Sequence, residues 1–338
     1  MTAGIVTFFD HNNYGAVLQS YALQKILEIN GAAVYHLRFP STKVEENAPT
    51  PCHPLIKKIG EHGRIRDQRF ASFRDKYLNV KEYCPETLSG TDVFITGSDQ
   101  VFNPTIPGWD SRYLLQFAGN APKVSYAASF GESPDEKFSG LFKAGLEDFS
   151  SISVREKSGV QIVKALTGKD ANCVLDPVFL IPSEEWERIA SESSLELSAS
   201  KPYILLIAVQ NDLSVYNEWK SLAEKRGLEL RIISPSLFLP AGFESWSGVG
   251  VEDFLKLLQN AEEVATSSFH ALAFSIIFRK KFHILSPQTD LQARSGRLAE
   301  LLDLLDADGT SLTEKSYDIL AEEAIKSTGF IKSHILEI

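Results

Sequence analysis

GIVTFFDHNNYGAVLQSYALQKILEINGAAVYHLR, residues 4–38, predicts a strand, a helix and a second strand in direct succession. Gly4–Phe9 is a short apolar run typical of a buried strand. Residues 16–29 carry apolar side chains at helical spacing, and Gly31 follows them as glycine often follows a helix. Residues 32–38 form the next apolar run. A strand–helix–strand unit of this kind implies a parallel sheet.

The same alternation continues along the chain in two series. Strands are expected at residues 92–96, 123–128, 151–154 and 172–175, and helices at 55–77, 135–149 and 156–166. The second series has strands at 203–209, 229–233, 263–266 and 282–285, and helices at 215–226, 252–259, 269–278 and 297–305. We therefore predict two α/β domains, residues 1–182 and 183–310, and a helical tail over 311–338 that can pack back on the body. Residues 40–54 are expected to form a surface loop.

Net charge and apolar content argue against nucleic-acid binding and against a membrane-spanning protein. The 338 residues include 34 Lys and Arg against 44 Asp and Glu, a net charge of −10. Such an overall field disfavours nucleic acid and anionic membranes as partners. The chain begins without the pattern of a signal peptide, and no stretch approaches the roughly 18 apolar residues of a membrane span.

The cysteines indicate a reducing compartment. Cys52, Cys84 and Cys173 are far apart and predict neither a disulfide framework nor a zinc site. We expect a cytoplasmic protein without a bound metal. Association with the inner face of the membrane and the oligomeric state are left open.

Polar clusters follow directly after several of the predicted strands. Because the carboxyl ends of parallel strands share one edge of a sheet, residues distant in sequence are expected to converge in the crevice there. Two sheets facing each other would place this site between the domains. The cluster residues are Asn13, Tyr14, Gly15, Ser98, Asp99, Gln100, Asn103, Ser129, Arg155, Glu156, Asp176, Ser267, Ser268 and His270.

Each cluster is also compatible with a purely structural role. Asn13 and Gly15 suit a tight turn and a helix start, although the exposed amides of such a start equally suit an anion. Arg155 and Glu156 fit a surface ion pair. His270 opens an apolar helix after two serines, where a histidine often caps the helix or fills the core. The common position of the clusters at strand ends favours the functional interpretation.

Six segments, taken together and in order, resemble the polysaccharide pyruvyl transferase family over residues 4 to 305. The segments are Asn13–Gln24 (NYGAVLQSYALQ), Gly97–Pro104 (GSDQVFNP), Ser125–Gly131 (SYAASFG), Ser153–Glu156 (SVRE), Leu175–Pro177 (LDP) and Thr266–Ser275 (TSSFHALAFS). The resemblance implies a glycosyltransferase-B-like fold, with two Rossmann-like domains facing a cleft. It also implies an enzyme that moves the pyruvyl group of phosphoenolpyruvate onto two hydroxyls of a sugar, releasing phosphate and leaving a cyclic ketal. No cofactor is implied, and the acceptor would be a cell-surface polysaccharide or exopolysaccharide, or its precursor, with a lipid-linked form left open.

The resemblance also assigns residues to roles. His270 aligns with the family's active-site histidine and Arg155 with its Ser-x-Arg-Glu arginine, so both are candidate catalytic residues. Candidate donor-binding residues are Arg297, Ser267, Ser268 and Arg294. Candidate cleft or acceptor residues are Asn13, Tyr14, Gly15, Ser98, Asp99, Gln100, Asn103, Ser129 and Glu156. The residue types agree with the chemistry, since arginines and helix-start amides suit a carboxylate and a phosphate, and a histidine suits proton transfer to the methylene carbon.

Two positions depart from the family's usual Thr-Asp-Ser-Phe-His-Gly segment. Ser267 replaces the aspartate and Ala271 replaces the glycine. Loss of a nearby carboxylate is expected to leave His270 less readily protonated.

Two other functions fit the same scaffold. A nucleotide-sugar-dependent glycosyltransferase would use Glu252 and Asp253, at a helix start, to contact a ribose. Alternatively, this pair is only a favourable match to the helix dipole. A non-catalytic glycan-binding protein would bind sugar whether or not His270 is present.

Overall fold

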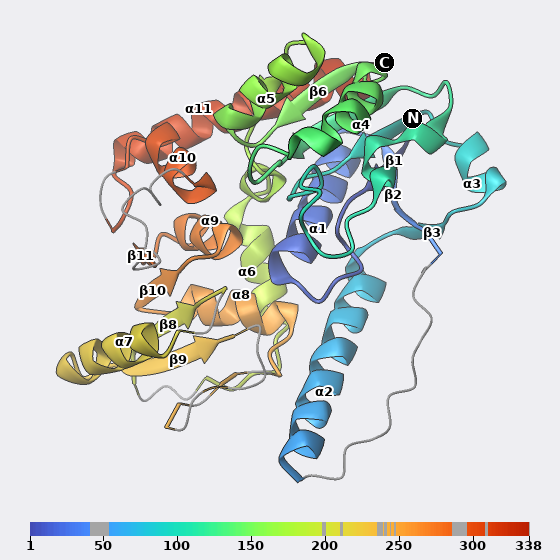
Figure 1. The fold of residues 1–338 in the computed structure, drawn as a ribbon. Helices are drawn as coiled ribbons and strands as arrows, with labels where there is room; N and C mark the ends of the chain where they lie inside the picture. Colours follow the sequence, from blue (N-terminus) through green and yellow to red (C-terminus); the bar gives the residue numbers. More distant parts are fainter. Residues whose placement is uncertain are drawn as a thin grey trace.

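The computed structural model describes residues 1–40, 54–197, 201–209, 212–234, 239, 242–243, 245–246, 248–285, 296–307 and 310–337, with backbone alone for 54–62. Within these ranges the chain forms an α/β structure with one parallel sheet of seven strands and a second of four. Figure 1 shows helices α1 and α6 in the middle of the molecule, with the first sheet above them and the second below. The predicted α/β fold with two parallel sheets is confirmed.

The first sheet has the strand order β3-β2-β1-β4-β5-β6-β7. Its strands are β1 Thr2–Val6, β2 Ala33–Arg38, β3 Val80–Glu82, β4 Val93–Thr96, β5 Lys123–Ala128, β6 Ser151–Val154 and β7 Asn172–Cys173. The order reverses between β1 and β4, so the loops after these two strands diverge and leave a crevice at the carboxyl edge. The expected strand over Gly4–Phe9 is shifted, because the chain leaves the sheet after Val6 and turns, with the Phe9 amide donating to the Thr7 carbonyl at 3.1 Å.

The second sheet has the strand order β11-β10-β8-β9. Its strands are β8 Tyr203–Ile207, β9 Glu229–Ile233, β10 Glu263–Thr266 and β11 Lys281–Ile284. All four strands are parallel, so their carboxyl ends also share one edge.

The helices fall between the strands, largely where apolar spacing predicts them. They are α1 Tyr14–Ile29, α2 Pro54–Tyr77, α3 Pro85–Ser89, α4 Glu136–Glu147, α5 Lys157–Thr167, α6 Ser183–Ser191, α7 Leu213–Lys225, α8 Val251–Asn260, α9 Phe269–Ile277, α10 Arg297–Leu304 and α11 Glu314–Ile331. Short 3-10 turns span Ser111–Leu114, Gln116–Ala118 and Pro177–Leu180, and one π-helical turn spans Lys332–Leu336. The sequence analysis missed β3, α3 and α6. The first two are too short for a periodic pattern, and α6 lies in the segment expected to link the domains.

One apolar cluster joins helices α1 and α2 to the second sheet. Trp186 of α6 is fully buried within it, beside Tyr21 of α1 and Phe274 of α9. Tyr14, at the start of α1, stacks on Phe254 of α8 with ring centroids 4.4 Å apart, and its hydroxyl donates to the Val249 carbonyl at 2.9 Å. Helices α1 and α2 therefore share a core with the second sheet, and aromatic packing holds the two halves of the molecule together.

The last helix returns to the first sheet. Ile331 and Phe330 of α11, with Ile335 in the turn that follows, pack in one cluster with Ala3, Ile5 and Val34 of β1 and β2. The Leu175 amide donates to the Ser327 hydroxyl at 2.9 Å, which fixes α11 beside the end of β7. The domain limits at residues 182 and 310 stay predictions. Among the described residues, no helix has the length and apolar character to cross a membrane.

We expect Ile331→Ala to lower the free energy of unfolding by about 2–5 kcal/mol, because Ile331 is fully buried and its truncation leaves a cavity. Ile325→Ala is the matched control on the same helix. Ile325 is 73% exposed, so its truncation should change stability by less than about 0.5 kcal/mol. Urea unfolding followed by circular dichroism measures both, and equal effects would mean that α11 is not packed against the sheet.

Candidate active site

A buried carboxylate, Asp176, lies where loops from both sheets meet. It follows β7, and its Oδ2 accepts hydrogen bonds from Arg155 Nη1 and Ser98 Oγ, each at 2.8 Å. His270 Nε2, at the start of α9, lies 3.3 Å from the same oxygen, within ion-pair distance but without the alignment of a hydrogen bond. The other carboxylate oxygen, Asp176 Oδ1, accepts a hydrogen bond from the Val178 amide. One carboxylate thus gathers side chains that follow β4, β6 and β10.

The charges explain why this carboxyl stays ionised although it is fully buried. Burial alone would raise the pKa of Asp176, but His270 and Arg155 outweigh it and hold the pKa well below its usual range. Burial alone would lower the pKa of Arg155, but Glu156 and Asp176 reverse this and raise it. Arg155 is therefore a permanent cation in a site from which water is largely excluded.

Arg155 is held on several sides. Its guanidinium lies 4.0 Å from the ring centroid of Phe269, and its Nε lies 3.5 Å from Glu156 Oε1. Glu156 in turn accepts from Ser129 Oγ at 2.6 Å, and burial raises the pKa of this carboxyl although Arg155 opposes the shift. Arg155 Nη2 is buried and has no hydrogen-bond partner among the described residues. A buried donor of this kind is available for an anionic ligand.

The start of α1 closes over His270. Asn13 caps this helix through its side chain, which accepts from the Ala16 amide at 3.2 Å. Two residues later Gly15 lies against the imidazole, where a Cβ would come within 2.0 Å of His270 Nδ1. Only glycine leaves room for the ring, so the starts of α1 and α9 meet directly at this contact.

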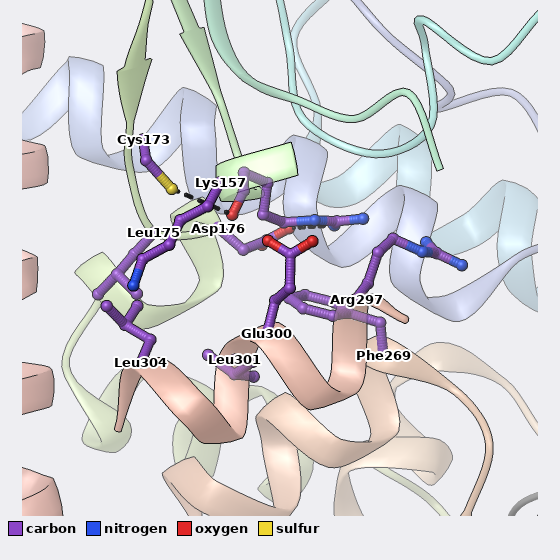
Figure 2. Close-up of a pocket in the computed structure, with 10 residues that line it drawn as sticks. Lys157, Cys173, Leu175, Asp176, Phe269, Arg297, Glu300, Leu301 and Leu304 are labelled. Atoms are coloured by element: carbon purple, nitrogen blue, oxygen red, sulfur yellow. Dashed lines mark hydrogen bonds and ion pairs between the residues drawn. The ribbon is translucent and has the colours of Figure 1, made fainter. Parts of the chain in front are cut away.

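A small cavity opens beside this cluster. Figure 2 shows Lys157, Cys173 and Leu304 at one end, Arg297 and Phe269 at the other, and Glu300 rising between them. Burial, and then the charge of Arg155, lower the pKa of Arg297. Its guanidinium lies 3.0 Å from the side-chain amide of Gln100, which accepts from both Nη atoms when its oxygen faces Arg297.

Gln100 and its neighbours form the other wall of the site. Asn103 Nδ2 lies 2.9 Å from the Gln100 amide, and a Cβ on Gly131 would strike that same amide. Asp99 adopts a left-handed backbone, with φ of 76°, which is unusual for a residue with a side chain. Its carbonyl accepts from the amides of Val101 and Ser129 at 2.8 and 2.9 Å, which hold this conformation. Strain of this kind is common at functional sites.

Most of the residues expected at strand ends do converge, but some do not face the cavity. Ser267 Oγ accepts from the Val209 amide at 3.1 Å, and Ser268 Oγ caps α9 by accepting from the Ala271 amide. Their hydroxyls therefore serve the backbone. Arg294 lies outside the described residues.

Of the two residues suggested for a ribose, Asp253 has internal partners. Asp253 accepts from Arg69 Nη1 at 2.6 Å and from Ser193 Oγ at 2.5 Å, and it is buried. Asp253 thus ties α2 to α8. Glu252, beside it, does not line the cavity described above.

Asp176 is the residue whose role the sequence analysis missed. The sequence places Asp176 directly after a strand. Only the fold brings it to His270, because the two residues follow strands of different sheets. The expectation that His270 lacks a nearby carboxylate is corrected by this contact. Within the described ranges, no group of three or more His, Cys, Asp or Glu side chains is placed to hold a metal ion.

Comparison with known sequences identifies the family. The sequence model described as polysaccharide pyruvyl transferase matches residues 13–289, which is most of the chain. The chain belongs to the polysaccharide pyruvyl transferase family. It is therefore an enzyme of this kind, and the family implies a sugar or glycan acceptor. A search of curated proteins finds no match.

Solved structures similar to this family member confirm the glycosyltransferase-B-type fold. The UDP-GlcNAc 2-epimerase from Neisseria meningitidis, bound to UDP-GlcNAc, has a TM-score of 0.51 and 10% identity, with full coverage of both chains. S. aureus MnaA with UDP has a TM-score of 0.52 and 13% identity, covering 96% of this chain and 87% of its own. At such identities the likeness concerns the fold alone.

We expect Asp176→Asn to destabilise the protein by about 3–5 kcal/mol at pH 7, because it leaves buried Arg155 short of a counter-charge. The pKa of Asp176 is lower in the folded protein than in the unfolded chain. Its ionised form therefore contributes stability above about pH 4, and this contribution is lost as the pH falls toward the folded value. The gap in stability between wild type and variant should narrow as the pH falls from 4 to 2, as read by urea unfolding. A gap that stays constant down to pH 2 would contradict this reading.

We expect Gly15→Ala to cost about 1–3 kcal/mol, because the new methyl group overlaps the His270 ring and forces it or α1 to move. Gly140→Ala, inside α4 with no heavy atom within 4 Å of the new Cβ, is the matched control and should not lower stability. Thermal unfolding compares the two, and ¹⁵N-imidazole NMR follows the His270 ring. An unmoved His270 signal in Gly15→Ala would show that the close contact is absent in solution.

Proposed function

We propose that this transferase moves the pyruvyl group of phosphoenolpyruvate onto two hydroxyls of a sugar, with no resident cofactor or metal. The observation that carries the proposal is the buried pair of Arg155 and His270 on a common carboxylate, at the edge of a cationic cavity. A donor with one carboxylate and one phosphate needs fixed cations in a dry site, because charge-assisted hydrogen bonds are strongest there.

The charge of the cavity supports an anionic ligand. Its lining includes the cations of Arg155, Lys157 and Arg297 against the anions of Asp176 and Glu300. Arg155 Nη2 adds a buried donor that no described residue satisfies. In this proposal Arg155 and Arg297 bind the two anionic groups of phosphoenolpyruvate, since the planar guanidinium matches both carboxylate and phosphate.

The reaction needs one proton delivered to carbon and two removed from oxygen. In our proposal His270 protonates the methylene carbon, a sugar hydroxyl attacks the neighbouring carbon, and its proton passes to a base. The carbon–oxygen bond to phosphate then breaks, and the second hydroxyl attacks the same carbon and loses its proton. One hydroxyl proton replaces the proton that His270 gave, and the other leaves with phosphate. Asp176 positions the imidazole and accompanies its charge.

The acceptor in this proposal is a sugar of a cell-surface polysaccharide or its precursor. A lipid-linked precursor would place the enzyme at the inner face of the membrane. The net charge of −10 gives no general attraction to an anionic lipid surface, so such an acceptor would be held through its sugar.

We expect phosphoenolpyruvate at about 100 times its dissociation constant to stabilise the wild type by about 2.7 kcal/mol in thermal unfolding. Arg297→Gln should lose most of this stabilisation, because Arg297 lines the cavity. The variant should still fold, because Arg297 is not one of the ion-paired residues around Asp176. Arg279→Gln, at an exposed arginine paired with Glu314, is the matched control and should respond like wild type. His270→Gln should keep donor binding but release phosphate at least about 100-fold more slowly in the presence of acceptor.

The same titration tests the other two functions. UDP and UDP-GlcNAc are bound by the similar structures named above, and a nucleotide-sugar-dependent enzyme would be stabilised by UDP-GlcNAc and not by phosphoenolpyruvate. That result would overturn the proposal. Sugar binding with no response to phosphoenolpyruvate in wild type, and no effect of His270→Gln, would instead indicate a glycan-binding protein.

A further inference from the structure

An open groove of about 630 Å³ lies between α5 and the loop that follows β5. Its size is within the range of about 300–1,000 Å³ that is usual for small-molecule sites. The turn from β6 into α5 separates this groove from the small cavity beside Asp176. Arg155 and Lys157 of the turn line the small cavity. Glu156 and Ser158 line the groove, so Glu156 is where the buried charged cluster reaches a larger opening.

The groove and the small cavity share a wall of side chains. Ser158, in the groove, donates from Oγ to Glu300 Oε1 at 2.6 Å, and Glu300 rises into the small cavity (Figure 2). Gly131, on the opposite side of the groove, lies against the Gln100 amide, which in turn contacts Arg297. A ligand in the groove and a ligand beside Arg297 would therefore be neighbours.

Glu156 is held as a hydrogen-bond acceptor. Ser129 Oγ accepts from the Gly131 amide at 3.1 Å, which leaves its own proton to donate to Glu156 Oε1 at 2.6 Å. The second oxygen, Oε2, accepts no hydrogen bond from any described residue and is not fully enclosed. The side chain does not cap α5, although Glu156 directly precedes that helix. One oxygen thus fixes the carboxylate, and the other is available to a ligand in the groove.

The charge of Arg155 is already balanced without Glu156. Asp176 accepts from Arg155 Nη1 at 2.8 Å, whereas Glu156 Oε1 lies 3.5 Å from Nε. A carboxylate is costly to bury unless it is closely paired, and burial raises the pKa of Glu156 although Arg155 and Ser129 oppose the shift. A buried carboxylate that is more basic than usual and borders an opening is typical of a group that accepts a proton during catalysis.

Glu156 and His270 approach the Arg155 guanidinium through different nitrogens. Nη1 bonds to Asp176, whose Oδ2 lies 3.3 Å from His270 Nε2, while Nε faces Glu156. The third nitrogen, Nη2, is buried and has no partner in the described part of the chain. In the proposed function an anionic group of the donor binds there. The donor would then have an imidazole on one side and a carboxylate on another.

We propose that Glu156 is the base that takes the proton of the attacking sugar hydroxyl and then gives it to the departing phosphate. The assignment rests on the proposed function. The hydroxyl oxygen bonds to the carbon that carries phosphate while its proton moves to Glu156. When the carbon–oxygen bond to phosphate breaks, the same proton passes to the phosphate oxygen. The second hydroxyl then attacks and gives its proton to His270, which replaces the proton that His270 gave to the methylene carbon.

The test measures phosphate release and donor binding on the same samples, with phosphoenolpyruvate as donor and methyl glycosides of glucose, galactose and mannose as acceptor probes. Glu156→Gln should release phosphate at least about 100-fold more slowly than wild type, because an amide cannot take the proton. Phosphoenolpyruvate should still stabilise this variant in thermal unfolding, because Gln can keep the Ser129 bond and Arg155 keeps Asp176. Glu136→Gln, at an exposed carboxylate that begins α4, is the matched control and should match wild type in both measurements.

A second variant distinguishes a base from a carboxylate that only supports the fold. Glu156→Ala leaves a space beside Ser129 that added formate can occupy as a small replacement carboxylate. Formate should raise phosphate release by Glu156→Ala about tenfold or more, because it restores a proton acceptor at that position. It should not raise release by Glu156→Gln, whose amide fills the space.

The outcomes separate this inference from the proposed function. Slow release by Glu156→Gln with intact donor binding, together with rescue of Glu156→Ala by formate, is the expected result. Release by Glu156→Gln within about threefold of wild type would overturn the inference and leave the proposed function standing. Loss of the phosphoenolpyruvate response in Glu156→Gln, or no rescue by formate, would also overturn it, because the carboxylate would then only shape the donor site. No release by wild type with any probe would overturn the proposed function itself.

Discussion

The structure depends on one buried negative charge. Asp176 is fully enclosed, and a carboxylate in that position is stable only if cations and donors surround it. Arg155 and Ser98 supply two hydrogen bonds from the first sheet, and His270 approaches from the second. The candidate catalytic pair is therefore held by the same charge balance that keeps the interior between the sheets stable.

The meeting of the two sheets is fixed with little freedom at the start of α1. Tyr14 of α1 stacks on Phe254 of α8, and the next residue must be glycine because the His270 ring occupies its side-chain position. Trp186 and its aromatic neighbours fill the space behind them. An opening motion between the two halves of the molecule would have to expose these rings to water.

Much of this arrangement can be predicted from the sequence, for identifiable reasons. The apolar runs that become β5, β6, β9 and β10 have the predicted ends, and the strand-end rule correctly brings Ser98, Arg155 and His270 together. Prediction from the sequence fails where an element is too short for a clear pattern, and where a contact joins residues that follow strands of different sheets. β3 is three residues long, α6 lies where a linker was expected, and Asp176 meets His270 only in the folded chain.

The path of α11 has a consequence for how the protein is made. This helix follows the whole second sheet in the chain, yet Ile331 and Ile335 cover Ala3 and Ile5 in the first strand. During synthesis on the ribosome, β1 must wait for residues 330–335 before that face of its sheet is covered. Until then an apolar surface stays exposed to solvent and to chaperones. The first sheet is therefore begun before the second sheet and covered only after it, and its apolar face is open to aggregation throughout that interval.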